Sequence, residues 1–330
     1  MFRVCIAGNS GHAATVTRAL PRLPQVEIAG WCRAWDGEPM TEVLDDFRTL
    51  GLCPPEFPDY KTMLDAVRPD VLVVDGLFCD HEEMTCEALA RGIHVYCDKP
   101  LALTLEGLAR VRAMAEASPA LLWAMQTARF DPWFYTAKRL IDKGAIGEIR
   151  LLSAQKSYRL GSRAPFFRDR TQHGGLIPWV AIHGIDFIRY LYPQAAETVF
   201  ASHSSAANGG YGDLEVTAQL MMTLAHGVSA QVSADYLRPM AAATHGDDRV
   251  RAAGTRGVLE VRDDQVWLIN ADHDGTVPMP LEAPPMIFED FILTLSGGGS
   301  GLLNLEESLE DSRLALLARQ SADTGLPVRC

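Results

Sequence analysis

The chain has 330 residues, of which 48% are hydrophobic and 22% charged, and its formal net charge is −12. This length predicts two domains, and this composition is typical of a folded globular protein. The acidic charge argues against a nucleic-acid surface, and no segment approaches the roughly 18 apolar residues of a membrane span.

The cysteines and the N-terminus indicate the compartment. The seven cysteines include no Cys-x-x-Cys pair, which favours free thiols in a reducing cytoplasm over disulfides or a zinc site, so no metal is expected. The chain enters an apolar strand at Arg3, so no export signal is expected either.

The first third alternates short apolar strands with helical patterns. The predicted strands are 3–7, 26–32, 70–74, 94–97 and 121–126. Strands separated by helices, with glycine or charge at the strand ends, predict a doubly wound parallel sheet.

A glycine-containing turn follows the first strand. Gly8 would make the tight bend and Ala13 would allow the helix to pack on the sheet, while Ser10 occupies the usual place of a second glycine. Gly11 can move the close approach to a pyrophosphate along by one residue. The expected cofactor-binding residues in this turn are Gly8, Asn9, Ser10, Gly11, His12 and Ala13.

The end of the second strand bears on the choice of cofactor. An acid at this point binds the ribose 2′-hydroxyl of NAD, whereas an arginine suits the 2′-phosphate of NADP. Arg33 follows the strand, so NADP is the preferred prediction and NAD the other candidate. In the alternative reading Arg33 is solvated and Asp36 binds the ribose.

The strand 94–97 ends in Asp98-Lys99-Pro100. Lysines are usually solvated, which is the plain interpretation of Lys99. Ligands in open α/β sheets bind at the carboxyl ends of the strands, so Lys99 is also a candidate site residue.

After residue 148 long alternating strands predict an antiparallel sheet with one covered face, most clearly in 216–224 and 228–236. A helix starting at Pro178 would place Trp179, His183 and Asp186 on one face. A buried histidine and aspartate are either used or satisfy each other in the core.

Several motifs resemble those of the Gfo/Idh/MocA oxidoreductase family. Asp98-Lys99-Pro100 is similar to the family's Glu-Lys-Pro, and Arg129-Phe130-Asp131-Pro132 to its Arg-Phe-x-Pro. The stretch from Gly174-Gly175 through His183 and Asp186 is similar to its Gly-Gly…Asp-x-x-x-His-x-x-Asp helix, and 323–328 to its closing segment.

The resemblance implies an α/β fold, with a Rossmann domain of doubly wound parallel sheet at 1–123. A C-terminal α+β substrate domain with a large, mostly antiparallel open sheet would follow at 124–330. It also implies a cytoplasmic homodimer or homotetramer formed through that sheet.

The resemblance further implies an NAD(P)-dependent enzyme acting on a hydroxyl of a sugar, polyol or cyclitol. Lys99 would stabilise the developing alkoxide and His183 would exchange the proton. Asp98, Lys99 and Pro100 join the cofactor residues. His81, after the third strand, is either a further cofactor contact, as the resemblance implies, or a structural histidine beside a helix cap. The candidate substrate contacts are Asp186, Trp179, Tyr158, Arg163, Arg168 and His173.

One departure keeps alternatives open. The family's acid four residues before the histidine is Trp179 here, and an indole cannot relay a proton. An oxidation-assisted elimination or epimerisation that recycles its cofactor would turn over without net change in NAD(P)H. A non-catalytic nucleotide or sugar sensor would bind the cofactor and turn over nothing.

Overall fold

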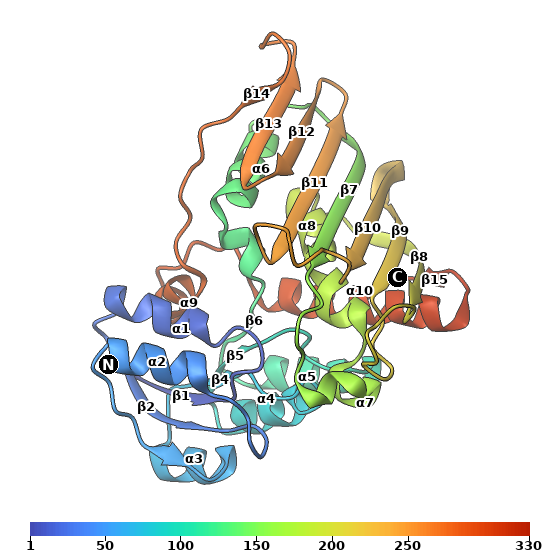
Figure 1. Cartoon of the computed structure of the whole chain (residues 1–330). Coiled ribbons are helices and arrows are strands. Elements are labelled where there is room, and N and C mark those ends of the chain that lie inside the picture. Colours follow the sequence, from blue (N-terminus) through green and yellow to red (C-terminus); the bar gives the residue numbers. More distant parts are fainter. The chain divides into compact units, whose positions relative to one another are not determined.

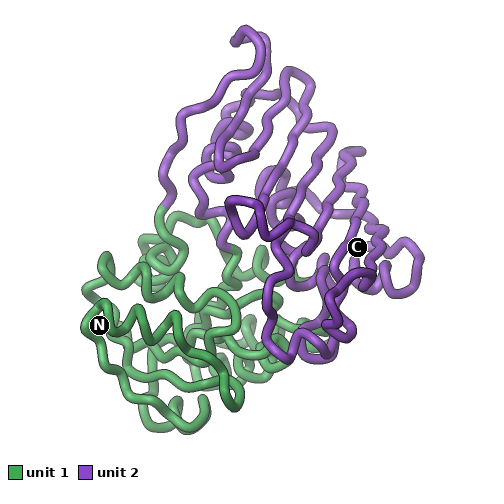
Figure 2. The backbone as a smooth tube through the Cα atoms, in the orientation of Figure 1, with its two compact units in different colours: residues 1–126, 285–312 green, residues 127–284, 313–330 purple.

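The computed structural model describes residues 1–330, which form two compact units (Figure 2). The first unit comprises 1–126 and 285–312, and the second comprises 127–284 and 313–330. The chain thus returns to the first unit near its end, which the expected division at residues 123 and 124 does not include. The functional assignment of the two predicted domains stays a prediction.

The first unit contains a six-stranded parallel sheet in the order β3-β2-β1-β4-β5-β6, as predicted for a doubly wound fold. Its strands are β1 (Phe2–Ala7), β2 (Val26–Cys32), β3 (Glu56–Phe57), β4 (Val71–Val74), β5 (His94–Cys97) and β6 (Leu122–Ala124). All four residues of β4 are buried, because helices cover both faces of such a sheet.

The helical segments of this unit are α1 (Ala14–Ala19), η1 (Leu20–Arg22), α2 (Thr41–Thr49), α3 (Tyr60–Val67), α4 (His81–Ala90), α5 (Leu105–Ala117) and α9 (Ile287–Leu295), with the start of α10 (Leu305–Thr324). The helices α1 to α5 connect the strands of the parallel sheet, whereas α9 and the start of α10 reach the unit from the later part of the chain (Figure 1). Aromatic contacts explain why α9 belongs here: the Phe288 and Phe291 rings lie 5.2 and 5.3 Å from Tyr96 on β5.

The second unit contains a nine-stranded sheet in the order β14-β13-β12-β11-β7-β10-β9-β8-β15. Only β7 and β10 pair in parallel, so the sheet is mostly antiparallel, as predicted. Its strands are β7 (Ile149–Tyr158), β8 (Ala196–Ser204), β9 (Thr217–Leu224), β10 (Val228–Asp235), β11 (Gly246–Gly254), β12 (Gly257–Arg262), β13 (Gln265–Asn270), β14 (Val277–Pro278) and β15 (Val328–Arg329).

Helices cover one face of this sheet, and α6 and α8 are the main ones (Figure 1). The helical segments are η2 (Thr127–Phe130), α6 (Pro132–Asp142), η3 (Pro165–Arg168), α7 (Arg170–His173), η4 (Ile177–Ala181), α8 (Ile182–Leu191), η5 (Ala225–Gly227) and the rest of α10. Phe134 of α6 stacks on Phe187 of α8 with ring centroids 4.1 Å apart. Side chains on β9 alternate between buried and exposed, so the other face of the sheet stays open.

Two further features bear on the expectations from sequence. None of the helices combines the length and the apolar character needed to cross a membrane. All seven cysteines are free thiols.

Candidate functional site

The glycine turn lies between the carboxyl ends of β1 and β4, where the strand order of the sheet reverses. Gly8 has a φ of +91°, and a Cβ there would lie 2.5 Å from the Asp75 carbonyl oxygen. The Ser10 amide donates to that same carbonyl over 2.8 Å. A left-handed residue this close to another backbone has to be glycine, which explains the first position of the motif.

Glu38, which the sequence analysis missed, organises the turn from the loop after β2. This glutamate is 1% exposed, and its Oε1 accepts from the Asn9 amide at 2.8 Å and the Ser10 hydroxyl at 2.7 Å. Its Oε2 accepts from the Ala34 amide at 2.7 Å. The Ser10 side chain, standing where a glycine is usual, is therefore held against Glu38.

Two buried aspartates approach the same turn. Asp75, directly after β4, accepts from the His12 amide at 3.0 Å and from the Ala13 amide at 2.7 Å. Asp98, directly after β5, contacts the His12 ring, with Oδ1 2.9 Å from Nδ1. A Cβ on Gly11 would stand 1.7 Å from Oδ2 of Asp98 and 2.7 Å from Oδ1 of Asp75, so the two carboxyl groups face each other across Gly11.

The environment separates the proton affinities of this pair. Burial, and next the charge of Asp98, raise the pKa of Asp75 well above its usual value. Burial also acts to raise the pKa of Asp98, but the charge and hydrogen bond of His12 outweigh it, so that pKa is lowered. Two adjacent buried carboxyls do not both ionise readily, and of the two Asp75 keeps its proton to the higher pH.

Lys99 follows this pair and is 1% exposed. Its amide donates to Oδ1 of Asp98 over 2.8 Å, which ties the lysine backbone to the carboxylate that contacts His12. The Lys99–Pro100 peptide is cis. Nδ1 of buried His81 donates to the Pro100 carbonyl at 2.8 Å, and burial lowers the pKa of His81 and so keeps its ring neutral. His81 therefore supports the loop that contains Lys99 and Pro100.

We expect Gly11→Ala to destabilise the protein by about 1–3 kcal/mol, as overpacked sites do, and to weaken NADH binding. The added methyl group would overlap Asp98, which the His12 and Lys99 contacts hold in place. Urea unfolding and a fluorescence titration with NADH measure both effects. Gly298→Ala is the control, because its Cβ would have no neighbour nearer than 3.8 Å. Equal stability of the two variants would contradict the packing at Gly11.

The raised pKa of Asp75 predicts how stability depends on pH. The unfolded chain ionises Asp75 at its ordinary pKa, so the stability that the neutral carboxyl contributes is complete below that value. It is lost as the pH rises through the raised folded-state pKa. We expect the melting temperature to fall with pH in this window more steeply in the wild type than in Asp75→Asn. The exposed-acid variant Asp65→Asn should keep the wild-type slope, and a matching slope in Asp75→Asn would exclude a proton on Asp75.

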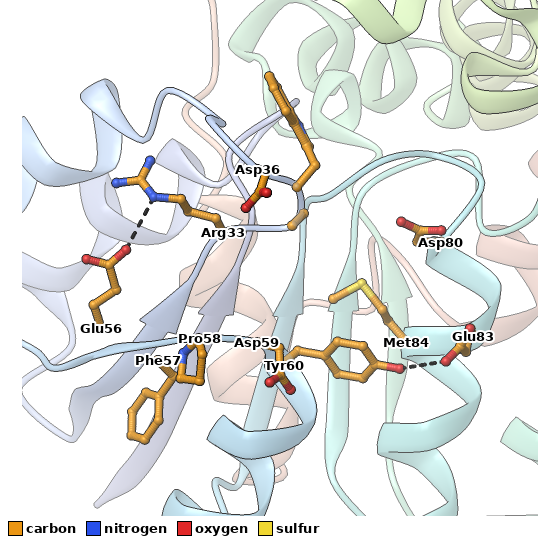
Figure 3. Close-up of a pocket in the computed structure, with 12 residues that line it drawn as sticks. Arg33, Asp36, Glu56, Phe57, Pro58, Asp59, Tyr60, Asp80, Glu83 and Met84 are labelled. Atoms are coloured by element: carbon orange, nitrogen blue, oxygen red, sulfur yellow. Dashed lines mark hydrogen bonds and ion pairs between the residues drawn. The ribbon is translucent and has the colours of Figure 1, made fainter.

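A pocket of ≈ 580 Å³ lies beyond the ends of β2 and β3 and is lined by Arg33 and Asp36 among others (Figure 3). Arg33 does not stand free in it. Its Nε is 3.3 Å from Oε1 of Glu56, its guanidinium lies over the Trp31 ring at 5.6 Å, and it donates to the Glu38 carbonyl. These contacts give no support to the NADP preference predicted from Arg33.

In the second unit the motif helix has two parts. The segment η4, which contains Trp179, is π-helical, and α8 follows it with His183 in its first turn. Trp179 is 8% exposed and His183 is 1% exposed. Single π-turns occur often at functional sites, because they turn side chains away from regular helical positions. The regular helix predicted to start at Pro178 is therefore wrong in its first turn.

Asp186, one turn after His183, forms a buried ion pair. Its Oδ1 lies 2.5 Å from Nε of Arg129, and the side chains are 0% and 1% exposed. The Arg129 guanidinium also lies over the Tyr190 ring at 5.2 Å. This pair joins the Arg-Phe-x-Pro-like segment to the motif helix, so Asp186 has a structural partner beside its predicted role toward substrate.

Ring contacts bring together several of the predicted substrate residues. We call these rings the aromatic cluster: Tyr158, Phe167, His173, Trp179 and Tyr236. The centroid of the Phe167 ring lies 5.8 Å from that of His173 and 6.3 Å from that of Trp179. The rings of Tyr158 and Tyr236 stack with centroids 6.4 Å apart. Phe167 and Tyr236 join the predicted members, and the sequence analysis missed both because their rings meet only in the folded chain.

Arg163 lies over two of these rings, with its guanidinium 4.5 Å from Tyr236 and 5.7 Å from Phe167. Nδ1 of His173 accepts from the Gly175 amide at 2.9 Å, and burial lowers its pKa to about 4, so this histidine is neutral and supports the Gly-Gly turn. Arg168 is exposed and donates to the Gly210 carbonyl at 2.6 Å, outside the aromatic cluster.

Comparison with known proteins gives the family. Residues 3–125 match the model of an oxidoreductase family with an NAD-binding Rossmann fold, and residues 134–260 match the model of the GFO/IDH/MocA C-terminal domain. A putative oxidoreductase from Thermotoga maritima of known structure is 38% identical with a TM-score of 0.96, over 99% of this chain and 100% of that one. The chain belongs to the Gfo/Idh/MocA oxidoreductase family.

Two further relatives of this Gfo/Idh/MocA oxidoreductase carry names with an activity. Inositol 2-dehydrogenase 2 of Saccharopolyspora erythraea is 30% identical over 171 residues, which are 52% of this chain and 49% of that protein. A levoglucosan dehydrogenase, solved in complex with NADH and levoglucosan, is 18% identical with a TM-score of 0.82 and covers 99% of this chain and 98% of its own. The second likeness concerns the fold alone.

The residues of the first unit fit a dinucleotide in this Gfo/Idh/MocA oxidoreductase. Gly8 and Gly11 let the glycine turn pack directly against Asp75 and Asp98 at the strand ends, and the pocket beside Arg33 opens at the strand ends where the nucleotide binds in such sheets.

Proposed function

We propose that this protein transfers a hydride between NAD and a secondary alcohol carbon of a sugar, polyol or cyclitol. The carrying observation is the link from His12 in the glycine turn through Asp98 to the buried Lys99. This link places Lys99 next to the glycine turn, which suits a pyrophosphate. The named activity of the inositol enzyme supports this substrate class.

When bound, the nicotinamide ring takes up the hydride from the substrate carbon. Lys99 would hold the substrate hydroxyl oxygen through its ammonium group and stabilise the charge on that oxygen as its proton leaves. The imidazole of His183 would accept that proton and return it in the reverse reaction. The hydride and the proton together are the two hydrogens that the alcohol loses as it becomes a ketone.

Burial makes these two groups suited to the task. Lys99 and His183 are each 1% exposed, and charge interactions are stronger where water is excluded. In this proposal the rings of the aromatic cluster would supply apolar faces for the C–H groups of a sugar ring, and Trp179 would contribute such a face in place of the family's acid. Asp186, Tyr158, Arg163 and His173 remain proposed substrate-side residues.

The proposal is tested by incubating the protein with NAD⁺ and a panel of cyclitols, aldoses and anhydrosugars while NADH absorbance is followed. We expect NADH formation with at least one member of the panel. A protein that binds NADH but oxidises none of them would favour the sensor reading, and consumption of a substrate without net NADH would favour the recycling reaction.

A further inference from the structure

The pocket beside Arg33 has an unusual charge balance. Its lining contains one cationic side chain and five carboxylates, which are Asp36, Glu56, Asp59, Asp80 and Glu83. Figure 3 shows Arg33 turned toward Glu56, and Tyr60 turned toward Glu83. The nearby Lys61 lies 2.8 Å from Glu83, so its charge is already matched.

Two of these carboxylates, Asp59 and Glu83, accept hydrogen bonds that favour their ionised form. Hydrogen bonds from the Thr62 amide and hydroxyl lower the pKa of Asp59. Hydrogen bonds from Lys61 and Tyr60 lower the pKa of Glu83. The pocket is therefore negative at neutral pH even with Arg33 in it.

Glu56 determines what Arg33 can bind. It stands on the edge strand β3, and its carboxylate meets the Nε side of the guanidinium at 3.3 Å. The guanidinium also packs over the Trp31 ring and donates to the Glu38 carbonyl. These three contacts engage Nε, Nη1 and one face of the guanidinium with groups of the protein itself.

NAD and NADP differ only in the group at the ribose 2′ position. The 2′-phosphate of NADP carries a charge of about −1.5 to −2 near pH 7 and needs an unmatched cation. The 2′-hydroxyl of NAD is neutral and donates to a carboxylate. A negative pocket whose only cation is ion-paired repels the first and accepts the second.

We propose that Glu56 is a specificity-determining residue that makes the pocket selective for NAD(H), because it pairs with Arg33 and leaves the carboxylates of the lining in excess. The proposal rests on the proposed dinucleotide-dependent function. It reverses the preference that Arg33 alone predicts from the sequence.

The test is a fluorescence titration of the full-length protein and its variants with NADH and, separately, with NADPH. We expect the wild type to bind NADH at least about tenfold more tightly. Glu56→Gln should tighten NADPH binding roughly 3- to 10-fold and change NADH binding by less than about twofold, on the scale of one partly exposed ion pair. Adding Arg33→Ala to that variant should abolish the gain.

Glu42→Gln is the matched control. Glu42 is 52% exposed and pairs with Arg18 at 2.8 Å, much as the 50% exposed Glu56 pairs with Arg33, but it does not line the pocket. We expect it to change neither affinity.

Three results would contradict the proposal, and they differ from one another. NADPH binding as tight as NADH binding in the wild type would remove the selectivity but leave the proposed enzyme function intact. A Glu56→Gln variant that behaves like Glu42→Gln would exclude Glu56 as its cause. A wild type that binds neither dinucleotide would remove the proposed function, and the inference with it.

Discussion

Replacing His183 by glutamine is expected to lower turnover by about 10²- to 10⁴-fold while leaving NADH affinity within a few-fold of the wild type. Glutamine keeps most of the size of the ring but cannot take up the hydroxyl proton. Lys99→Met should lower turnover by about 10²- to 10³-fold, because it removes the cation at the developing alkoxide. Steady-state kinetics with the best substrate, and titration with NADH, measure the two quantities separately.

His226→Gln provides the control for this experiment. His226 sits at positive φ in the turn between β9 and β10, and we assign it no role in the reaction. We expect full activity in this variant. If both His183→Gln and Lys99→Met turned over at the wild-type rate, the proposed mechanism would have to be abandoned. A loss of NADH binding in either variant would instead indicate a structural role.

Arg129→Met is expected to destabilise the protein by about 3–5 kcal/mol, because it removes the guanidinium that pairs with the buried Asp186 carboxylate. An effect of this size exceeds that of nearly any exposed ion pair. Urea unfolding followed by tryptophan fluorescence measures it. The methionine keeps much of the volume of the arginine, so the loss reports the charge and hydrogen bond rather than a cavity.

A double replacement separates pairing from packing. In Arg129→Met with Asp186→Leu neither charge remains, and much of the lost stability should return, as happens when a buried ion pair becomes apolar. Arg139→Met is a control on the partly exposed side of α6, where a loss of at most about 1 kcal/mol is expected. If Arg129→Met and Arg139→Met were equally stable, the buried pair would not contribute as described.

Local patterns were enough to predict the framework of both units. The run at β4 is apolar at every position, and β9 alternates apart from the exposed Met221, so burial on two faces and on one face can be read from the residues. The motif residues Lys99 and His183 were also identifiable, because they stand in recognisable order along the chain. Their predicted roles await the experiments above.

The features that the sequence could not predict depend on contacts between residues far apart in the chain. β3 has two residues and no pattern of its own, yet it supplies Glu56. Glu38 lies in a loop, and only the folded chain brings it to Ser10. Segment 285–312 joins the first unit through the rings of α9, although it lies far along the chain. Asp75 could have been identified from the sequence, since an acid directly after a fully apolar strand is unusual.

The most direct test of the central claim follows the hydride itself. A substrate found in the panel is prepared with deuterium on the carbon that bears the reacting hydroxyl, and the protein is incubated with it and NAD⁺. Mass spectrometry of the cofactor should show NADH carrying one deuterium, formed at similar rates by the wild type and by His226→Gln but at least about 10²-fold more slowly by His183→Gln. Unlabelled NADH, or labelled NADH formed equally by His183→Gln, would contradict the account.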